Sequence, residues 1–289
     1  MLAAESFFSR DGLGQFGFRW LHILAGITWI GLLYYFNFVQ VPAFAEYGDE
    51  GRARNIAIDK IARRALWWFR WSALSTFVIG ILITMVARDY YSNNFGKQAG
   101  GIAISTGMLL GTIMMLNVWG VIWRCQKVVL ANAANVVAGG EADPAAAAAG
   151  RKAFMASRQN VVFSVSMLFF MVFKGHSPRL VDVDLSSGKV GGFWAITIII
   201  ILVMELNALG LMPWKAQPNK GLNAMYDGPG IRNVLISAFG LWVVFLILTE
   251  VFLWEDLLRR WSADGERRLH VAVAGDGADH LVGPGGQRS

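Results

Sequence analysis

Cysteine is almost absent from this sequence of 289 residues, in which Cys125 is the single example. One thiol excludes an internal disulfide and every metal or iron–sulfur site built from several cysteines. It also excludes a covalently attached haem c, because no C-x-x-C-H motif is present. Charge is scarce as well, since charged residues make up 16% of the chain against about 25% in soluble proteins. We therefore expect neither a disordered chain nor a nucleic-acid-binding arm.

Hydrophobic residues are abundant instead, at 55% of the chain, and the mean hydropathy is +0.45. A membrane-spanning helix needs about 20 predominantly apolar residues. Six stretches fit this length or approach it: 17–41, 66–87, 103–123, 159–174, 191–213 and 233–254. The 12 Trp residues suit membrane–water interfaces. The sequence predicts an all-α fold, a polytopic integral membrane bundle of about six transmembrane helices in contact with the lipid bilayer.

The fourth stretch has a short apolar centre but a helix start upstream of it. Asp143 followed by Pro144 is typical of an N-cap with proline at the first helical position. We expect one helix to begin there in water and to run without a break into the membrane. It would close a helical hairpin over about 125–158, on the cytoplasmic side.

The transmembrane domain is predicted to cover residues 17–255, after an N-terminal segment 1–16 and before a flexible, Gly- and Asp-rich tail 256–289. Lys and Arg are concentrated in the loops 42–65, 124–158 and 214–232. Because cytoplasmic loops carry an excess of Lys and Arg, these loops are predicted to be cytoplasmic. Both termini are then expected outside.

Two histidines lie near the outer face in this topology. His22 is about one turn inside the first span, and His176 follows the fourth. Histidines on separate helices at one depth could be the axial ligands of the iron in a b-type haem, and Arg19 could meet a haem propionate. The alternatives are a neutral His22 bonded to a neighbouring helix and a His176 that is an ordinary loop residue.

The inner half of the predicted bundle carries polar residues that packing does not require. Arg70, Asn117, Asn160 and Glu205 all lie there, and a buried charge must be paired or line a wet cavity. We expect a cytoplasm-facing pocket for a planar, anionic or carbonyl-rich molecule, with Arg70 and Glu205 paired and catalytic. The alternative is a set of interfacial anchors, which suffices for Arg158 as a snorkelling side chain.

Several of these stretches together resemble one family. They are RWLHILAGITWIGLLYYFNFVQ (19–40), RALWWFRWSALSTFVIGILI (64–83), NVWGVIWRCQK (117–127), SRQNVVFSVSMLFFMVFKGH (157–176) and ELNALG (205–210). The sequence is similar to the membrane domain of bacterial membrane-bound urate oxidases, also called urate hydroxylases, over about residues 17 to 255.

The resemblance implies oxidation of urate toward 5-hydroxyisourate in purine breakdown, at the inner (cytoplasmic) membrane of a bacterium. In that family a cytochrome c domain follows the membrane part, whereas this chain has no haem c motif. Electrons are therefore expected to leave through a separate cytochrome c or a quinone. The alternative is a non-catalytic subunit of a larger respiratory or photosynthetic membrane complex. A transporter is a weaker alternative, because no internal repeat or broken helix is visible.

Overall fold

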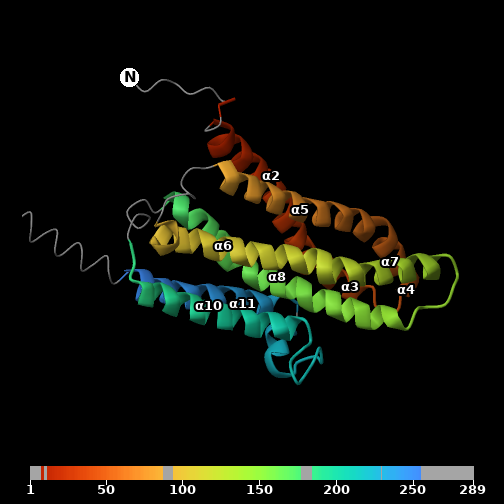
Figure 1. The fold of residues 1–289 in the computed structure, drawn as a ribbon. Helices are drawn as coiled ribbons and strands as arrows, with labels where there is room; N and C mark the ends of the chain where they lie inside the picture. Colours follow the sequence, from red (N-terminus) through yellow and green to blue (C-terminus); the bar gives the residue numbers. More distant parts are fainter. Residues whose placement is uncertain (1–7, 10–11, 87–93, 177–183, 229, 255–289) are drawn as a thin grey trace, which may run out of the picture.

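The protein is a bundle of long helices, which a computed structural model describes for residues 8–9, 12–86, 94–176, 184–228 and 230–254 (Figure 1). Six helices in these ranges are long and apolar enough to cross a membrane. They are Phe18–Glu46, Gly51–Val86, Ala99–Val137, Ala145–Phe173, Ser187–Ala208 and Arg232–Leu253. The predicted all-α fold with six spans is confirmed, and the chain is a multi-pass membrane protein. The predicted tail 256–289 and most of the segment 1–16 lie outside the described residues.

Each of the first three spans is helical along its whole length, but a π-helical turn separates its two α-helical parts. The first span consists of α2 (Phe18–Tyr34), η2 (Tyr35–Gln40) and α3 (Val41–Glu46). The second consists of α4 (Gly51–Ala57), η3 (Ile58–Ala62) and α5 (Arg63–Val86). The third consists of α6 (Ala99–Leu116), η6 (Asn117–Ile122) and α7 (Trp123–Val137). Short segments η1 (Leu13–Gly17), η5 (Phe95–Lys97), η7 (Gly221–Met225) and η8 (Glu250–Trp254) complete this part of the fold.

These helices are longer than a membrane is thick. The third span has 39 residues and is therefore about 58 Å long at 1.5 Å per residue. The hydrocarbon core of a bilayer is about 30 Å thick. The bundle is therefore long enough to project from the membrane, and α3, α4 and α7 lie together at one of its ends (Figure 1).

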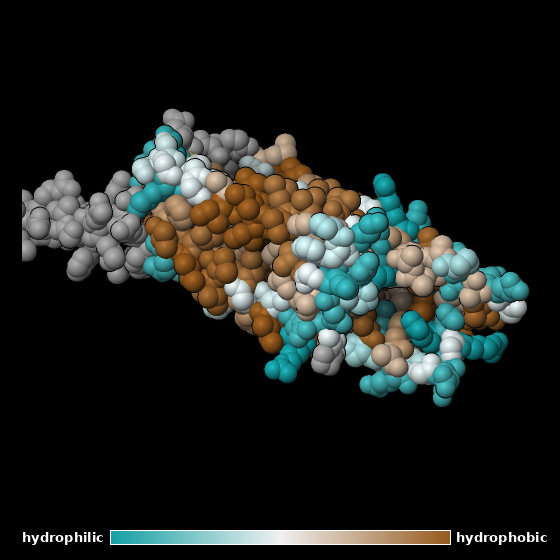
Figure 2. Space-filling model, turned by 90° about the horizontal axis from the view of Figure 1, so that it is seen from below, coloured by the Kyte–Doolittle hydropathy of each residue, from teal (hydrophilic) through white to brown (hydrophobic). Residues whose placement is uncertain are grey.

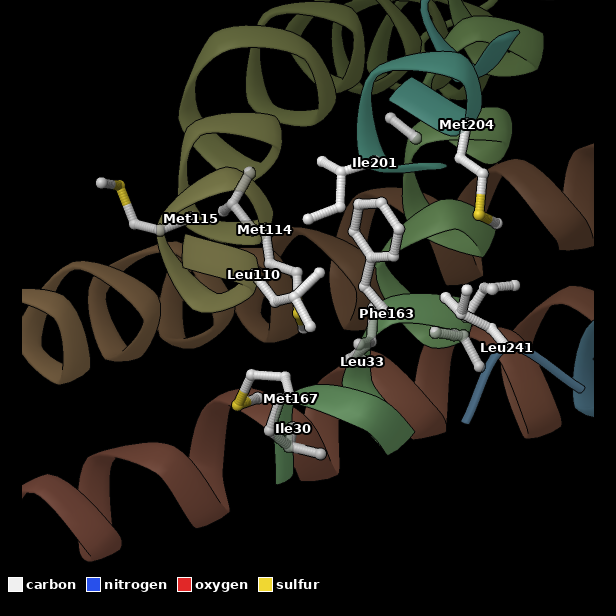
Figure 3. Close-up of a cluster of buried hydrophobic side chains, with 14 of the residues drawn as sticks. Ile30, Leu33, Leu110, Met114, Met115, Phe163, Met167, Ile201, Met204 and Leu241 are labelled. Carbon is white, nitrogen blue, oxygen red and sulfur yellow. The ribbon is translucent and has the colours of Figure 1, made fainter. Parts of the chain in front are cut away.

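The helix α8 (Ala145–His176) is the centre of the bundle. It begins directly after Pro144, and the carboxylate Oδ1 of Asp143 accepts a hydrogen bond from the Ala145 N–H at 2.8 Å. The N-cap and the early start expected from the sequence are thus present. Phe163 in the middle of α8 is completely buried. Apolar side chains from α2, α6, α10 and α11 lie around it (Figure 3), among them Ile30, Leu33, Leu110, Met114, Ile201, Met204 and Leu241.

The helices α10 (Ser187–Ala208) and α11 (Arg232–Thr249) form a face that is hydrophobic on its outside (Figure 2). Large apolar side chains there remain exposed, including Ile199, Leu202, Ile236, Phe239 and Ile247. Soluble monomers rarely expose a contiguous apolar surface of this kind. The face therefore fits contact with lipid.

The fifth span ends earlier than the predicted boundary at residue 213. α10 stops at Ala208, and Gly210 adopts a φ of 74°, the left-handed conformation that favours glycine. The Leu211 N–H then donates to the Leu206 carbonyl at 2.9 Å, which closes a Schellman-type turn. The prediction followed hydropathy past this turn, although Gly210 followed by Pro213 is a helix stop signal.

The predicted sidedness can be tested with single cysteines in a Cys125→Ala background. Glu141→Cys lies in the exposed turn between α7 and α8, and Ser187→Cys lies at the exposed start of α10. With both termini outside, a membrane-impermeant maleimide added to intact cells labels the Ser187→Cys protein and spares the Glu141→Cys protein. Both variants should react after the membrane is opened. The opposite labelling pattern would reverse the orientation.

Candidate functional site

Three of the predicted site residues come together between α8, α10 and the start of η6. The Asn117 Nδ2 donates to Asn160 Oδ1 at 3.1 Å and to Glu205 Oε2 at 3.2 Å. The Asn160 Nδ2 donates to the Met114 carbonyl at 3.0 Å. Both asparagines are buried, and Glu205 is half-buried. We call Asn117, Asn160 and Glu205 the amide–carboxylate cluster.

The π-helical turn η6 begins at Asn117, the residue that joins the three helices. A π-helical turn changes the direction of the side chains that follow it and is frequent at functional sites. Here Asn117 meets α8 and α10, whereas Trp119 in the same turn donates through its Nε1 to the Arg70 carbonyl of α5 at 3.0 Å. One side of η6 therefore bonds to α8 and α10, and the other side bonds to α5.

A second polar layer, which the sequence analysis missed, adjoins the cluster. The Tyr226 hydroxyl donates to Gln159 Oε1, and the Trp214 Nε1 donates to Asn207 Oδ1 at 2.6 Å. Gln159 is completely buried, and its Nε2 has no hydrogen-bond partner in the described part of the chain. A buried amide donor without a partner is costly, and a hydrogen bond to a water or ligand acceptor would relieve that cost.

Tyr226 is a buried phenol bonded to Gln159, the residue before Asn160 of the cluster. Burial raises the pKa of its phenol, the neighbouring Asn207 side chain acts in the opposite direction, and the charge of Glu205 raises the pKa further. Tyr226 is therefore a neutral hydroxyl at physiological pH. Gln159 could have been found from the run Arg158-Gln159-Asn160 at the entry to an apolar helix. Tyr226 lies in the connection between two spans, and no sequence pattern singles it out.

Arg70 does not pair with Glu205, contrary to the prediction. Its guanidinium carbon lies 3.8 Å from the centroid of the Trp123 ring, and Glu205 accepts its hydrogen bond from Asn117 instead. Arg70 is thus separated from the amide–carboxylate cluster by the helix that carries Asn117 and Trp123. The catalytic and substrate-binding roles predicted for Arg70 have no support from its contacts.

Arg158 is not a snorkelling side chain. It is 2% exposed, donates through Nη1 to the Gly230 carbonyl at 3.0 Å, and its guanidinium carbon lies 4.7 Å from the Phe154 ring centroid. Further toward the start of α8, Arg151 forms two hydrogen bonds to the Asp227 carboxylate, at 2.5 and 2.8 Å. These arginines hold the connection between α10 and α11 against α8, and so they position Tyr226.

The two histidines lie in different environments. The His22 ring is half-buried, and its Nδ1 is 2.9 Å from the Thr76 carbonyl of α5. His176 is exposed at the end of α8, with Nδ1 3.1 Å from the Val172 carbonyl of its own helix. Arg19 is exposed as well. No described contact joins the two imidazole rings.

His22 has the arrangement expected of a metal ligand. A carbonyl only accepts, so the hydrogen bond to Thr76 places the proton on Nδ1 and leaves Nε2 with its lone pair. Histidines that bind metals usually donate their other ring nitrogen to a carbonyl or carboxylate in this way. The absence of a side chain at Gly80 lets the His22 ring pack closely against α5, because a Cβ at that position would lie only 3.2 Å from the His22 Cε1. This tautomer is compatible with a haem ligand, and the bond to α5 equally matches the alternative of a neutral His22 bonded to a neighbouring helix. His176 bonds only within its own helix and is exposed.

Comparison with known proteins supplies no family for this chain, because no family model, curated protein or solved structure matches it. Function therefore has to be argued from the chemistry of the site. The amide–carboxylate cluster and Gln159 offer N–H donors and a carboxylate acceptor within the candidate membrane spans. Such a set can orient a small planar molecule that carries carbonyl and N–H groups.

The ion pair between Arg151 and Asp227 makes a pH-dependent contribution to stability. Burial acts to raise the pKa of Asp227, but the hydrogen bonds from Arg151 and Asn219 and the charges of Arg151 and Arg158 outweigh it and hold the pKa below its usual value. The stabilisation is therefore complete above the unfolded pKa of about 3.9 and is lost as pH falls through the folded value.

We expect Asp227→Asn to lower the free energy of unfolding by about 2 kcal/mol at neutral pH, because charge-assisted hydrogen bonds are lost. The difference from wild type should be smaller at about pH 3 than at neutral pH, because protonation of the carboxylate begins to remove the stabilisation there. Thermal unfolding in detergent at the two pH values measures this. Asp59→Asn is the matched control, since it removes the more exposed pair with Arg63 and should have a much smaller effect. Equal effects of both substitutions would contradict the assignment.

Proposed function

We propose that this protein is a membrane-bound oxidoreductase of the urate hydroxylase type, which it resembles in sequence, and that urate or a related planar molecule binds at the amide–carboxylate cluster. The observation that carries the proposal is the Asn117–Asn160–Glu205 hydrogen-bond chain inside the membrane part of the bundle. Buried polar groups of this kind are expensive in a bilayer and are usually functional.

The chemistry of the cluster is compatible with this substrate class. Urate carries carbonyl oxygens and ring N–H groups in one plane. The unpartnered Gln159 Nε2 supplies a donor for a carbonyl, and the Glu205 carboxylate supplies an acceptor for an N–H. Tyr226 is neutral and buried, and it contacts Gln159 from the connection between α10 and α11.

Oxidation of urate to 5-hydroxyisourate adds the oxygen of water and releases two electrons and two protons. In this proposal Glu205, which is half-buried, accepts a proton. A b-type haem, when bound, would carry the electrons one at a time toward an outer cytochrome c or quinone. His22 would hold that haem through Nε2, with His176 proposed as the second ligand and Arg19 near a propionate.

The haem proposal predicts an optical signature. The purified protein should show a Soret band, and His22→Ala should abolish it or shift it, because the fixed axial ligand is lost. Thr28→Ala on the same helix is the control, since its hydroxyl bonds only to its own backbone, at Leu24. An unchanged spectrum in His22→Ala would exclude His22 as a ligand, and the absence of any Soret band would exclude the haem.

The substrate proposal predicts a loss of turnover on removal of the carboxylate. Glu205→Gln keeps the size and the hydrogen bond of the side chain but cannot take up a proton, so kcat for urate should fall about 100-fold or more. Glu46→Gln, at an exposed helix end, should leave turnover unchanged. Turnover is followed by the loss of urate absorbance with an added electron acceptor. If wild type in its native assembly lacks urate turnover, a non-catalytic subunit becomes the better description.

A further inference from the structure

Arg70 is a cation within a membrane-spanning helix, and no acidic side chain of the described residues pairs with it. Its guanidinium rests on the Trp123 ring, and it has no hydrogen-bond or ion-pair partner among the described residues. The residue is half-buried, so part of the guanidinium remains accessible. A cation at membrane depth without a counter-charge is unfavourable, which points to a partner from outside the chain.

α5 and the helices beside it carry no acidic residue, and Asp59, in the π-helical turn before α5, is already paired with Lys60 and Arg63. No Asp or Glu occurs in α5 from Arg63 to Val86, in the helix from Ala99 to Val137 that it packs against, or in α2. Further cations lie along the same two helices, at Arg64, Arg124 and Lys127. The charge at this end of the bundle is therefore complementary to an anion.

Tryptophans surround the cation on the lipid-exposed side. Trp67, Trp68 and Trp71 of α5 are 46%, 59% and 41% exposed. The Trp67 and Trp68 ring centroids are 4.9 Å apart, and those of Trp71 and Trp119 are 5.3 Å apart, both pairs edge-on. Indole rings prefer the headgroup level of a bilayer. This aromatic surface therefore lies where Arg70 can reach the phosphates of lipids.

We propose that Arg70, framed by Trp71, Trp119 and Trp123, binds the headgroup phosphate of an anionic phospholipid. A guanidinium matches a phosphate through two parallel hydrogen bonds, and stacking on Trp123 fixes its plane for that contact. The acyl chains of the lipid cover the exposed indole rings. An anionic lipid satisfies the site better than a zwitterionic one, because only the anionic lipid neutralises the cation.

The predicted topology agrees with this ligand. The Arg70 end of α5 adjoins the loop 42–65, which is predicted to be cytoplasmic, and the cytoplasmic leaflet carries a negative surface potential. The proposal does not depend on urate or haem, because Arg70 lies on the other side of the helix from the amide–carboxylate cluster.

The test uses the fluorescence of the protein's own tryptophans in bilayers of brominated phosphatidylcholine, which quenches them. Unbrominated phosphatidylglycerol or phosphatidylcholine is then titrated in, and recovery of fluorescence gives the selectivity for the anionic lipid. Wild type should prefer phosphatidylglycerol. Arg70→Gln should lower that selectivity about fivefold, the equivalent of the roughly 1 kcal/mol contributed by one basic residue near a charged surface.

Arg52→Gln is the matched control, because it removes an exposed arginine of α4 and should leave the selectivity unchanged. Arg70→Lys keeps the charge but not the planar fork and should give an intermediate value. Inorganic phosphate added at the same concentration should not displace the lipid. Equal affinity of wild type for the two lipids would overturn the proposal even if Arg70→Gln fails to fold. So would unchanged selectivity in Arg70→Gln, or displacement by free phosphate.

Discussion

A bilayer offers no water to satisfy polar side chains, and helix α8 forms many of the hydrogen bonds that meet this constraint. Helix α8 is enclosed by its neighbours, and its polar residues bond to several of them. Ser164 bonds to Tyr34 at 2.9 Å, Ser157 accepts from Asn37 at 2.8 Å, and Asn160 accepts from Asn117. Because the unsatisfied groups would each cost several kcal/mol in lipid, these bonds fix how the helices are placed around α8.

Much of the fold follows from patterns that the chain displays locally. Hydropathy located all six spans, and Asp143-Pro144 marked the true start of α8 well before its apolar part. The end of α10 was misjudged because apolar residues continue past the turn, where the left-handed Gly210 rather than polarity ends the helix. Sidedness still rests on the distribution of Lys and Arg alone.

The site was predictable where depth alone identifies a residue and unpredictable where a contact depends on helix rotation. Asn117, Asn160 and Glu205 share one depth on three helices, and they meet. Arg70 has a similar apparent depth, but it faces Trp123 on another side of the third span. Tyr226 enters from a connecting loop whose path is set by the arginines of α8, a long-range arrangement without a sequence period.

The length of the third span has a mechanical consequence. Its 39 residues join the polar interior to the exposed turn before α8. Asn117 and Trp123 lie at the two ends of the π-helical turn η6, partway along that helix. A bend at η6 would therefore change the position of the exposed end relative to the amide–carboxylate cluster.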